Sequence, residues 1–361
     1  MSTNNSQDNK TAKSNHIGVV LIAAIAVLIM YMAVYLIYNK MNDDENEKSA
    51  QAAADAARMT TTSFEETTAT TTELYNYNYL DIPDAEKISA RSALLYNKTT
   101  NTILFEKNSD MKCYPASTTK LITSIVALSN VSPDTVYTVG TEIQLIGENS
   151  STAYLVEGSQ LKLESLIYAM LLPSGNDAAY TVAVNTARIV SGNQDMTDEQ
   201  AVSYFCGLMN GLASELEMEN THFADPDGWY MENHYVTAKD MLKIALKAME
   251  FPIITNASSS LVYTVTPENG SPVYTWKNNN KFLSEESEFY FPYATGLKTG
   301  FTDEAGYCYV ATARKDGTEL VALLFGSQTV EDRYRDARNL FNSVFEPSAI
   351  EYADVTTAPV E

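Results

Sequence analysis

The stretch CYPASTTKLITSIVAL, residues 113–128, places Ser117 three residues before Lys120 at the start of an apolar run. The run predicts a buried helix over 118–129. Ser117 then has two interpretations. Serine is a favoured helix cap, but a helix also holds residues three apart within reach of each other. Burial disfavours the charged form of a lysine, and a neutral lysine can take the proton of a serine nucleophile.

The S-x-x-K spacing alone is not specific, because the chain contains it twice more. Ser109 precedes Lys112 in a polar turn, where no helix would hold the pair together. Ser159 precedes Lys162 at the start of a second predicted helix, over 161–172, where it is interpreted as a plain cap. Ser117 therefore needs support from other parts of the chain.

Two further motifs supply that support. PSGNDAAY places Ser174 and Asn176 between two predicted helices, and GLKTGFTDEAGYC places Lys298, Thr299 and Gly300 ahead of a predicted strand. The order S-x-x-K, S-x-N, K-T-G is the pattern of penicillin-recognising serine enzymes. Together the three motifs favour Ser117 as a nucleophile.

Composition narrows the class of protein. The chain has 361 residues, a net charge of −22 and a pI of about 4.5, which argues against a nucleic-acid partner. Three widely spaced cysteines, Cys113, Cys206 and Cys308, favour buried free thiols over one disulfide plus a free thiol. With His16 ahead of an apolar segment, only His222 and His234 remain for a soluble domain, too few for a three-histidine zinc site.

The N-terminal region predicts a membrane anchor. Residues 17–38 carry no charge and as a helix would span about 33 Å, enough to cross a bilayer. A cleaved signal peptide has a shorter apolar core. Lys10 and Lys13 precede the segment, so residues 1–16 are expected in the cytoplasm and the rest of the chain outside it. Residues 39–79, acidic and rich in threonine, predict a disordered linker.

The folded domain is predicted over 80–346, with 347–361 as a flexible tail. Two strands are expected around a turn at 98–101, and a hairpin is expected to turn at 316–317. Helices are expected over 176–190, 199–216 and 332–345. Strands near both ends with helices between them favour an α+β domain whose sheet joins the two ends of the chain.

The residues in and around the motifs are more specific than the motif spacing. They resemble the serine-type D-alanyl-D-alanine carboxypeptidases, the low-molecular-mass penicillin-binding proteins of peptidase family S11. The stretches that carry this resemblance are YPASTTKLIT, PSGNDAA, ENTHFADPDG, NHYVTAKDM and GLKTGFTDEAGYC. The resemblance implies a β-lactamase/transpeptidase-like domain, with an antiparallel sheet flanked by helices and a helical subdomain. It implies a cell-wall hydrolase that removes the terminal D-alanine from peptidoglycan pentapeptide stems, without metal or cofactor, and is acylated by β-lactams.

The resemblance also implies a role for each catalytic position. Ser117 corresponds to the nucleophile and Lys120 to its general base. Ser174 corresponds to the residue that returns a proton to the leaving D-alanine. Asn176 corresponds to the residue that orders Lys120 and holds the substrate amide, and Lys298 to a second lysine whose charge keeps Lys120 neutral.

Four more positions are expected to bind the substrate. Thr299 and Arg333 would contact its terminal carboxylate; for Arg333 the less favoured alternative is a solvated charge at a helix start. Backbone N–H groups of Ser117 and Phe301 would form the oxyanion hole, and Gly300 would let the backbone approach closely. Phe301 replaces a residue that is often polar or tyrosine-like in the family.

Three other functions are compatible with parts of the same sequence pattern. A class A-like β-lactamase would need a glutamate four residues before an asparagine, but Leu216 precedes Asn220 at that distance. A D,D-endopeptidase acting on cross-linked peptides is not separated from a carboxypeptidase. A non-enzymatic exported wall-binding protein is disfavoured because the whole catalytic set is present. His222 and His234 are expected to be structural, and Cys308 to pack in the core.

Overall fold

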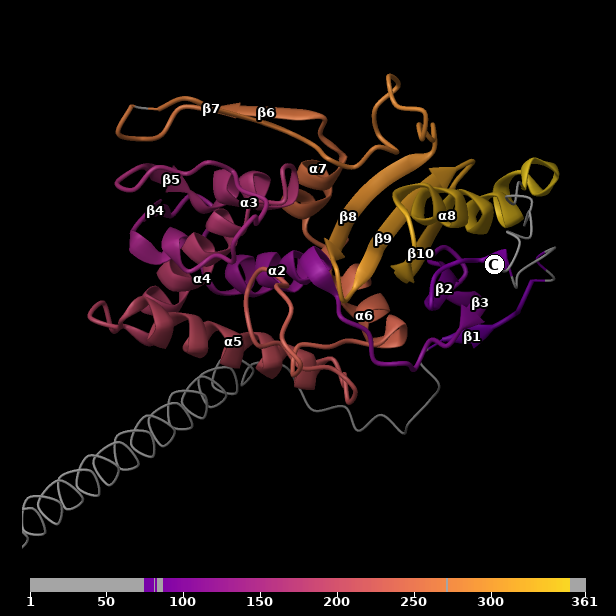
Figure 1. Ribbon diagram of the computed structural model, residues 1–361, viewed down its shortest axis with the longest axis horizontal. Helices are drawn as coiled ribbons and strands as arrows, with labels where there is room; N and C mark the ends of the chain where they lie inside the picture. Colours follow the sequence, from indigo (N-terminus) through magenta and orange to yellow (C-terminus); the bar gives the residue numbers. More distant parts are fainter. Residues whose placement is uncertain (1–74, 81, 83–86, 271, 351–361) are drawn as a thin grey trace, which may run out of the picture. The chain divides into compact units, whose positions relative to one another are not determined.

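The computed structural model describes residues 75–80, 82, 87–270 and 272–350. The part of the chain that it describes contains the following elements (Figure 1): β1 (Asn76–Tyr77), β2 (Ser92–Asn97), β3 (Thr102–Lys107), η2 (Ala116–Thr119), α2 (Lys120–Asn130), β4 (Val136–Thr138), η3 (Thr141–Gln144), β5 (Gln160–Lys162), α3 (Leu163–Leu171), α4 (Asn176–Ser191), α5 (Asp198–Glu215), α6 (Ala238–Ala248), α7 (Pro252–Ser259), β6 (Val262–Val265), β7 (Tyr274–Lys277), β8 (Ala294–Thr302), β9 (Gly306–Lys315), β10 (Thr318–Ser327), α8 (Val330–Phe345) and η4 (Pro347–Ala349).

The main sheet has the order β1-β3-β2-β10-β9-β8, so it joins strands from the two ends of the domain as expected. The strands are antiparallel except that β1 pairs parallel with β3. The expectation of a purely antiparallel sheet is therefore wrong at this edge. The two-residue strand β1 pairs with β3, but no hairpin joins these two strands, because β2 lies between them in the chain. Without a hairpin the pairing does not have to be antiparallel.

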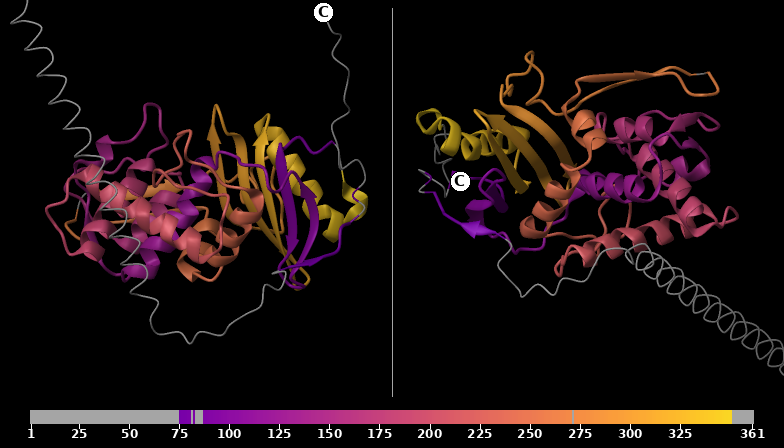
Figure 2. Two further views of the ribbon diagram at one scale, coloured as in Figure 1. Left: turned by 90° about the horizontal axis from the view of Figure 1, so that it is seen from below. Right: turned by 180° about the vertical axis from the view of Figure 1, so that it is seen from behind.

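Alternating side chains cover the two faces of the sheet. In β2, Leu94 and Tyr96 join one hydrophobic cluster, while Ala93 and Leu95 join the other. The first cluster includes buried residues of α2 to α7, and the second is completed by α8. Figure 2 shows the sheet between α8 on one side and the remaining helices on the other. The period of two therefore gives the sheet two buried faces.

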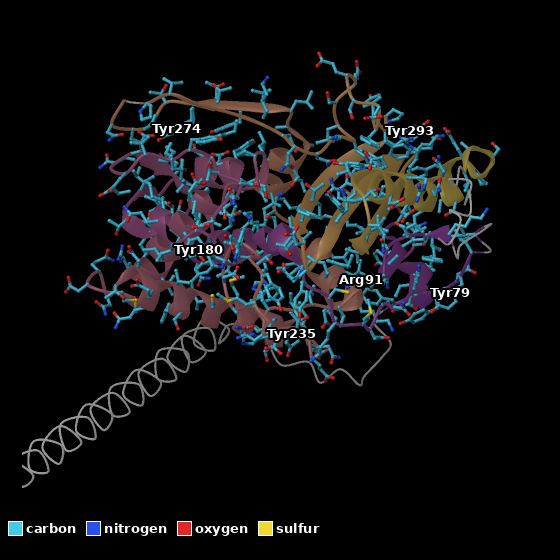
Figure 3. All side chains as sticks on the ribbon, in the orientation of Figure 1. Tyr79, Arg91, Tyr180, Tyr235, Tyr274 and Tyr293 are labelled. Carbon is cyan, nitrogen blue, oxygen red and sulfur yellow. The ribbon has the colours of Figure 1, made fainter. Side chains whose placement is uncertain are left out.

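Helix α2 is the centre of the helical part. Its side chains from Lys120 to Ala127 are all buried, and it contacts α3, α4, α5 and α6. The small hairpin of β6 and β7 lies beside α3 (Figure 1), and Tyr274 of β7 is labelled in Figure 3. A helix that is buried on all sides, such as α2, needs neighbours on every side of it. The turn η2, directly before α2, contacts β8 and β9 of the main sheet.

Three local expectations need correction. The helix expected over 161–172 begins at Leu163, because residues 160–162 pair with β4 as strand β5. Ser159 caps no helix; its hydroxyl contacts the Tyr274 hydroxyl at 2.8 Å. Lys298, Thr299 and Gly300 lie within strand β8 and not ahead of a strand.

Other expectations are confirmed. The hairpins at 98–101 and 316–317 form, and all three cysteines are free and buried. Within the described ranges, no helix combines the length and the apolarity needed to cross a membrane. The predicted anchor at 17–38 lies outside the described residues.

Candidate active site

Ser117 lies in the 3₁₀ turn η2, directly before α2. The cap interpretation is wrong, because the α-helix begins at Lys120 and Ser117 makes no capping hydrogen bond. The Oγ atom of Ser117 instead accepts a hydrogen bond of 2.8 Å from Nζ of Lys120. The tighter turn, with its i to i+3 bonds, brings the serine side chain to the lysine three residues on.

Lys120 is fully buried and has three hydrogen-bond acceptors around its Nζ. These are Oγ of Ser117 at 2.8 Å, Oδ1 of Asn176 at 2.7 Å and the backbone oxygen of Asp227 at 2.8 Å. Burial lowers the pKa of Lys120 to about 8, although the carboxylates of Asp227, Asp225 and Asp177 oppose the shift. Loss of one proton near neutral pH would free a lone pair beside Ser117.

The loop 225–228, whose Asp227 oxygen accepts from Lys120, is stabilised by hydrogen bonds within the loop. Oδ1 of Asp225 accepts hydrogen bonds from the N–H groups of Asp227 and Gly228, at 3.0 and 2.6 Å. Gly228 has a φ of 88°, and a Cβ there would lie 1.8 Å from the Ala116 oxygen. Only glycine fits this position. The sequence interpretation missed Asp227, although Asp-Pro-Asp-Gly is a recognisable turn signal.

His234 supports the same loop, as a structural residue. Its Nδ1 lies 3.3 Å from Oδ2 of Asp225, and its Nε2 lies 3.0 Å from Oγ1 of Thr119. Although burial opposes it, the pKa of Asp225 is lowered by His234 and by hydrogen bonds. The buried histidine thus links the loop to the turn that carries Ser117.

Lys298 is the second buried lysine, and its Nζ donates to the Thr299 oxygen at 2.9 Å. Burial lowers the pKa of Lys298 well below its usual value, and the charges of Lys120 and Arg333 lower it further. Two lysines that are both desolvated and mutually repelling cannot readily hold two positive charges. The protonation states of Lys120 and Lys298 are therefore linked.

Gly300 lets strand β8 approach the serine turn. A Cβ at Gly300 would lie 2.9 Å from the backbone nitrogen of Ser117 and 3.2 Å from the Pro115 oxygen. Any larger residue would have to push the two backbones apart. The backbone of β8 next to Phe301 therefore lies close to the backbone N–H of Ser117.

Thr299 and Arg333 line the same cleft. Oγ1 of Thr299 donates to Oδ1 of Asn279 at 3.2 Å, a contact between residues 20 positions apart that no sequence motif predicts. Arg333 is only 7% exposed and donates from Nη1 to the Gly300 oxygen at 3.3 Å. The solvated-surface interpretation of Arg333 is therefore wrong.

The predicted residues meet at a cleft of about 700 Å³. Ser174 enters it from the connection between α3 and α4 with a φ of 66°, and Asn176 is the first residue of α4. Lys120 and Lys298 do not line the cleft. Those predicted residues that do are Ser117, Ser174, Asn176, Thr299, Gly300, Phe301 and Arg333.

The arrangement is a serine, a buried lysine and a close-packed strand beside one cleft. Residues 80–329 match the family described as D-alanyl-D-alanine carboxypeptidase, peptidase S11. The chain belongs to this family. The S11 membership agrees with the resemblance of the motifs, and it favours the carboxypeptidase interpretation over a β-lactamase.

Individual S11 relatives show the extent of the similarity. The chain is 33% identical over 267 residues to a D-alanyl-D-alanine carboxypeptidase of Streptomyces sp. (strain K15), covering 72% of this chain and 88% of the relative. The D-alanyl-D-alanine carboxypeptidase DacF of Bacillus subtilis (strain 168) is 28% identical over 71% of this chain. The chain spans only 62% of that relative's length.

A solved structure of the family gives the same fold. The crystal structure of the Streptomyces K15 DD-transpeptidase superposes with a TM-score of 0.65 at 32% identity, covering 72% of this chain and 97% of that one. The residues that match the S11 family include every residue lining the cleft except Arg333.

Proposed function

We propose that this protein is a serine D-alanyl-D-alanine carboxypeptidase that cleaves the terminal D-alanine from peptidoglycan pentapeptide stems, with Ser117 as its nucleophile. The observation that carries the proposal is the 2.8 Å hydrogen bond between Nζ of Lys120 and Oγ of Ser117, at a cleft bordered by β8. Membership of the S11 family supports the reaction class.

In the acylation step, neutral Lys120 takes the Ser117 proton as Oγ attacks the carbonyl carbon of the penultimate D-alanine. The N–H groups of Ser117 and Phe301 stabilise the resulting oxyanion, an interaction that typically contributes about 3 kcal/mol per donor. The carbon–nitrogen bond then breaks, and Ser174 passes the proton to the leaving D-alanine. Water hydrolyses the ester on Ser117 and regenerates the free hydroxyl.

The substrate itself would set the charge of Lys120. Without substrate, three acceptors and nearby carboxylates favour protonated Lys120, while burial opposes it. A substrate carboxylate held by Thr299 and Arg333 would favour a charged Lys298, and this second charge would favour neutral Lys120. The base would then become active when a correct carboxyl terminus is bound.

The same chemistry would accept β-lactams. Their strained amide presents a carbonyl to Ser117 and a carboxylate to Thr299, and ring opening would leave an ester on Ser117. A solved relative, penicillin-binding protein D2 of Listeria monocytogenes, is described in its ampicillin-bound form, at 26% identity and a TM-score of 0.57. Fluorescent penicillin is therefore a direct probe of the nucleophile.

We further propose that the protein is anchored in the cell membrane through residues 17–38, with residues 1–16 in the cytoplasm. The uncharged segment and the preceding lysines support this orientation. The linker predicted over 39–79 would end before β1, because Asn76 and Tyr77 pair with β3 in the main sheet. As a flexible coil the remaining residues would have a mean reach of about 35 Å. The catalytic domain at 80–346 and the tail at 347–361 would lie outside the membrane. Protease treatment of intact spheroplasts should remove the domain; full protection would contradict this placement.

The function is tested by release of D-alanine from a pentapeptide stem, with Ser117→Ala as control. No release by the wild-type protein would overturn the proposal. Rapid hydrolysis of a chromogenic cephalosporin would instead favour a β-lactamase. Cleavage of a cross-linked muropeptide dimer would add endopeptidase activity, the activity for which a Pseudomonas aeruginosa relative at 28% identity is named.

A further inference from the structure

Three exposed carboxylates lie at the rim of the cleft. Asp303 and Glu304 form the turn between β8 and β9, and Glu148 lies in the loop 147–151; all three line the cleft. Among the described residues, none of the three carboxylates has a hydrogen bond or ion pair. We call these three residues the acidic rim.

Other parts of the domain hold the backbone of the acidic rim in place, and they do so without contacts to its carboxylates. Nη2 of Arg91, labelled in Figure 3, donates to the backbone oxygens of Glu304 and Ala305 at 3.2 and 3.0 Å. On the other side, Gly147 packs under Trp229, where a Cβ would lie 2.5 Å from the indole ring. The rim charges are therefore presented by backbone that is fixed from both sides.

The cleft is also lined by a positive charge. Arg333 is 7% exposed, lines the cleft, and its Nε has no hydrogen-bond partner in the described part of the chain. A buried guanidinium with an unused donor calls for an anionic ligand. The cleft thus combines a cation at one position with free carboxylates at another, and it fits a ligand that carries both charges.

Strand β8 gives the direction between the two charges. In the proposed function the substrate carboxylate would lie at Thr299 and the scissile carbonyl at Phe301, so the preceding part of the peptide would continue along β8 toward Thr302 and Asp303, which line the same cleft. With about 3.3 Å per extended residue, the residue just before the two D-alanines falls beside the acidic rim. The rings of Phe301 and Tyr307, with centroids 4.4 Å apart, offer an apolar surface on the way.

We propose that the acidic rim selects peptides in which the residue before D-Ala-D-Ala has an aliphatic side chain ending in a free, protonated amine. The methylenes would lie on Phe301, and the ammonium would face Glu148, Asp303 and Glu304. Acylation of this amine, as in a cross-linked stem, removes the charge and weakens binding. The inference rests on the proposed carboxypeptidase function.

The test compares two peptides that differ only in this charge. These are Nα-acetyl-L-lysyl-D-alanyl-D-alanine, with a free side-chain amine, and its Nα,Nε-diacetyl counterpart. For the wild-type protein, kcat/KM for D-alanine release should be about tenfold higher with the free amine at low salt, falling toward about twofold at high salt. The triple variant Glu148→Gln, Asp303→Asn, Glu304→Gln should bring the ratio close to one.

A matched control separates the rim from the general acidity of the chain. The variant Glu157→Gln, Glu285→Gln, Glu286→Gln changes the net charge equally at exposed positions that do not line the cleft, and it should keep the wild-type ratio. Labelling with fluorescent penicillin verifies that each variant is folded. A wild-type ratio near one, or a ratio that the rim variant leaves unchanged, would overturn the charge selection alone. No D-alanine from either peptide would overturn the proposed function instead.

Discussion

Nζ of Lys120 lies 2.8 Å from Oγ of Ser117 and 2.7 Å from Oδ1 of Asn176, so one buried lysine joins two of the three sequence motifs. The proposed base therefore contacts the proposed nucleophile directly. What remains to be set is its protonation state, because a lysine that donates to three acceptors is arranged as an ammonium.

Ser117→Ala should abolish both D-alanine release and labelling by fluorescent penicillin, with a loss of roughly 10⁴-fold or more in kcat. The reason is that no other oxygen at this position can form the acyl-enzyme. Ser159→Ala is a matched control from another S-x-x-K sequence and should keep activity. Equal labelling of wild type and Ser117→Ala would place the nucleophile elsewhere.

The rate should depend on pH through Lys120. Its pKa is lowered to about 8 by burial, and only the neutral amine accepts a proton. In consequence kcat/KM should rise about tenfold per pH unit below pH 8 and level off above it. A profile that is flat between pH 6 and 9 would exclude Lys120 as the base. Steady-state rates of D-alanine release give the profile.

Arg333→Ala should reduce kcat/KM by about 10- to 100-fold for a peptide that ends in a carboxylate, because a charged hydrogen bond is lost. A peptide ending in D-alaninamide should be a poor substrate of the wild type and should lose little further in the variant. Arg335→Ala, on the same helix but outside the cleft, serves as control. Equal losses for both peptides would show that Arg333 acts on structure and not on the carboxylate.

Two glycines should respond differently to alanine. Gly300→Ala places a methyl 2.9 Å from the Ser117 nitrogen and should lower kcat about 10²- to 10³-fold by disturbing the oxyanion hole. Gly228→Ala meets the Ala116 backbone at 1.8 Å with a φ of 88°, so it should lower the free energy of unfolding by roughly 2–4 kcal/mol. Thermal melting and kinetics of both variants separate the effects; a Gly300→Ala protein with wild-type kcat would contradict the assignment.

The cysteines should be inert in the native protein. Burial raises the pKa of Cys113 to about 11 and that of Cys308 to about 12, and the thiolate is the reactive form. A chromogenic disulfide reagent should therefore react with no thiol of the folded domain at pH 8, and with all of them after denaturation. Rapid reaction of a single native thiol would show that one of these sites opens readily.

Local signals in the sequence predicted local structure well. The hairpin between β9 and β10 was predictable because Asp316-Gly317 is a strong turn signal between two apolar strands. The α-helix start was predicted at 117–118 and lies at Lys120, since a single 3₁₀ turn is not distinguishable from helix by periodicity. The order of the three motifs predicted residues that come together in the fold, since each motif contributes side chains to the lining of one cleft.

Contacts made only in the folded chain could not be predicted. The backbone oxygen of Asp227 accepts a hydrogen bond from Lys120. A backbone contact of this kind does not require a particular residue type, so only the turn signal is visible in the sequence. Asn279 contacts Thr299 across a long connection of ordinary composition. The burial of Arg333 depends on how α8 packs on the sheet, and a charged residue at a helix start is usually exposed.

The sheet order has a consequence for how the protein folds. Strand β2 pairs with β10, so Leu94 meets Leu323, residues that are far apart in the chain. Such high contact order makes folding slow and prevents the sheet from closing before the last strand has been synthesised. Arg333 of α8, which lines the same cleft as Ser117, follows β10 in the chain. A chain truncated before β10 would therefore lack both the closed sheet and Arg333.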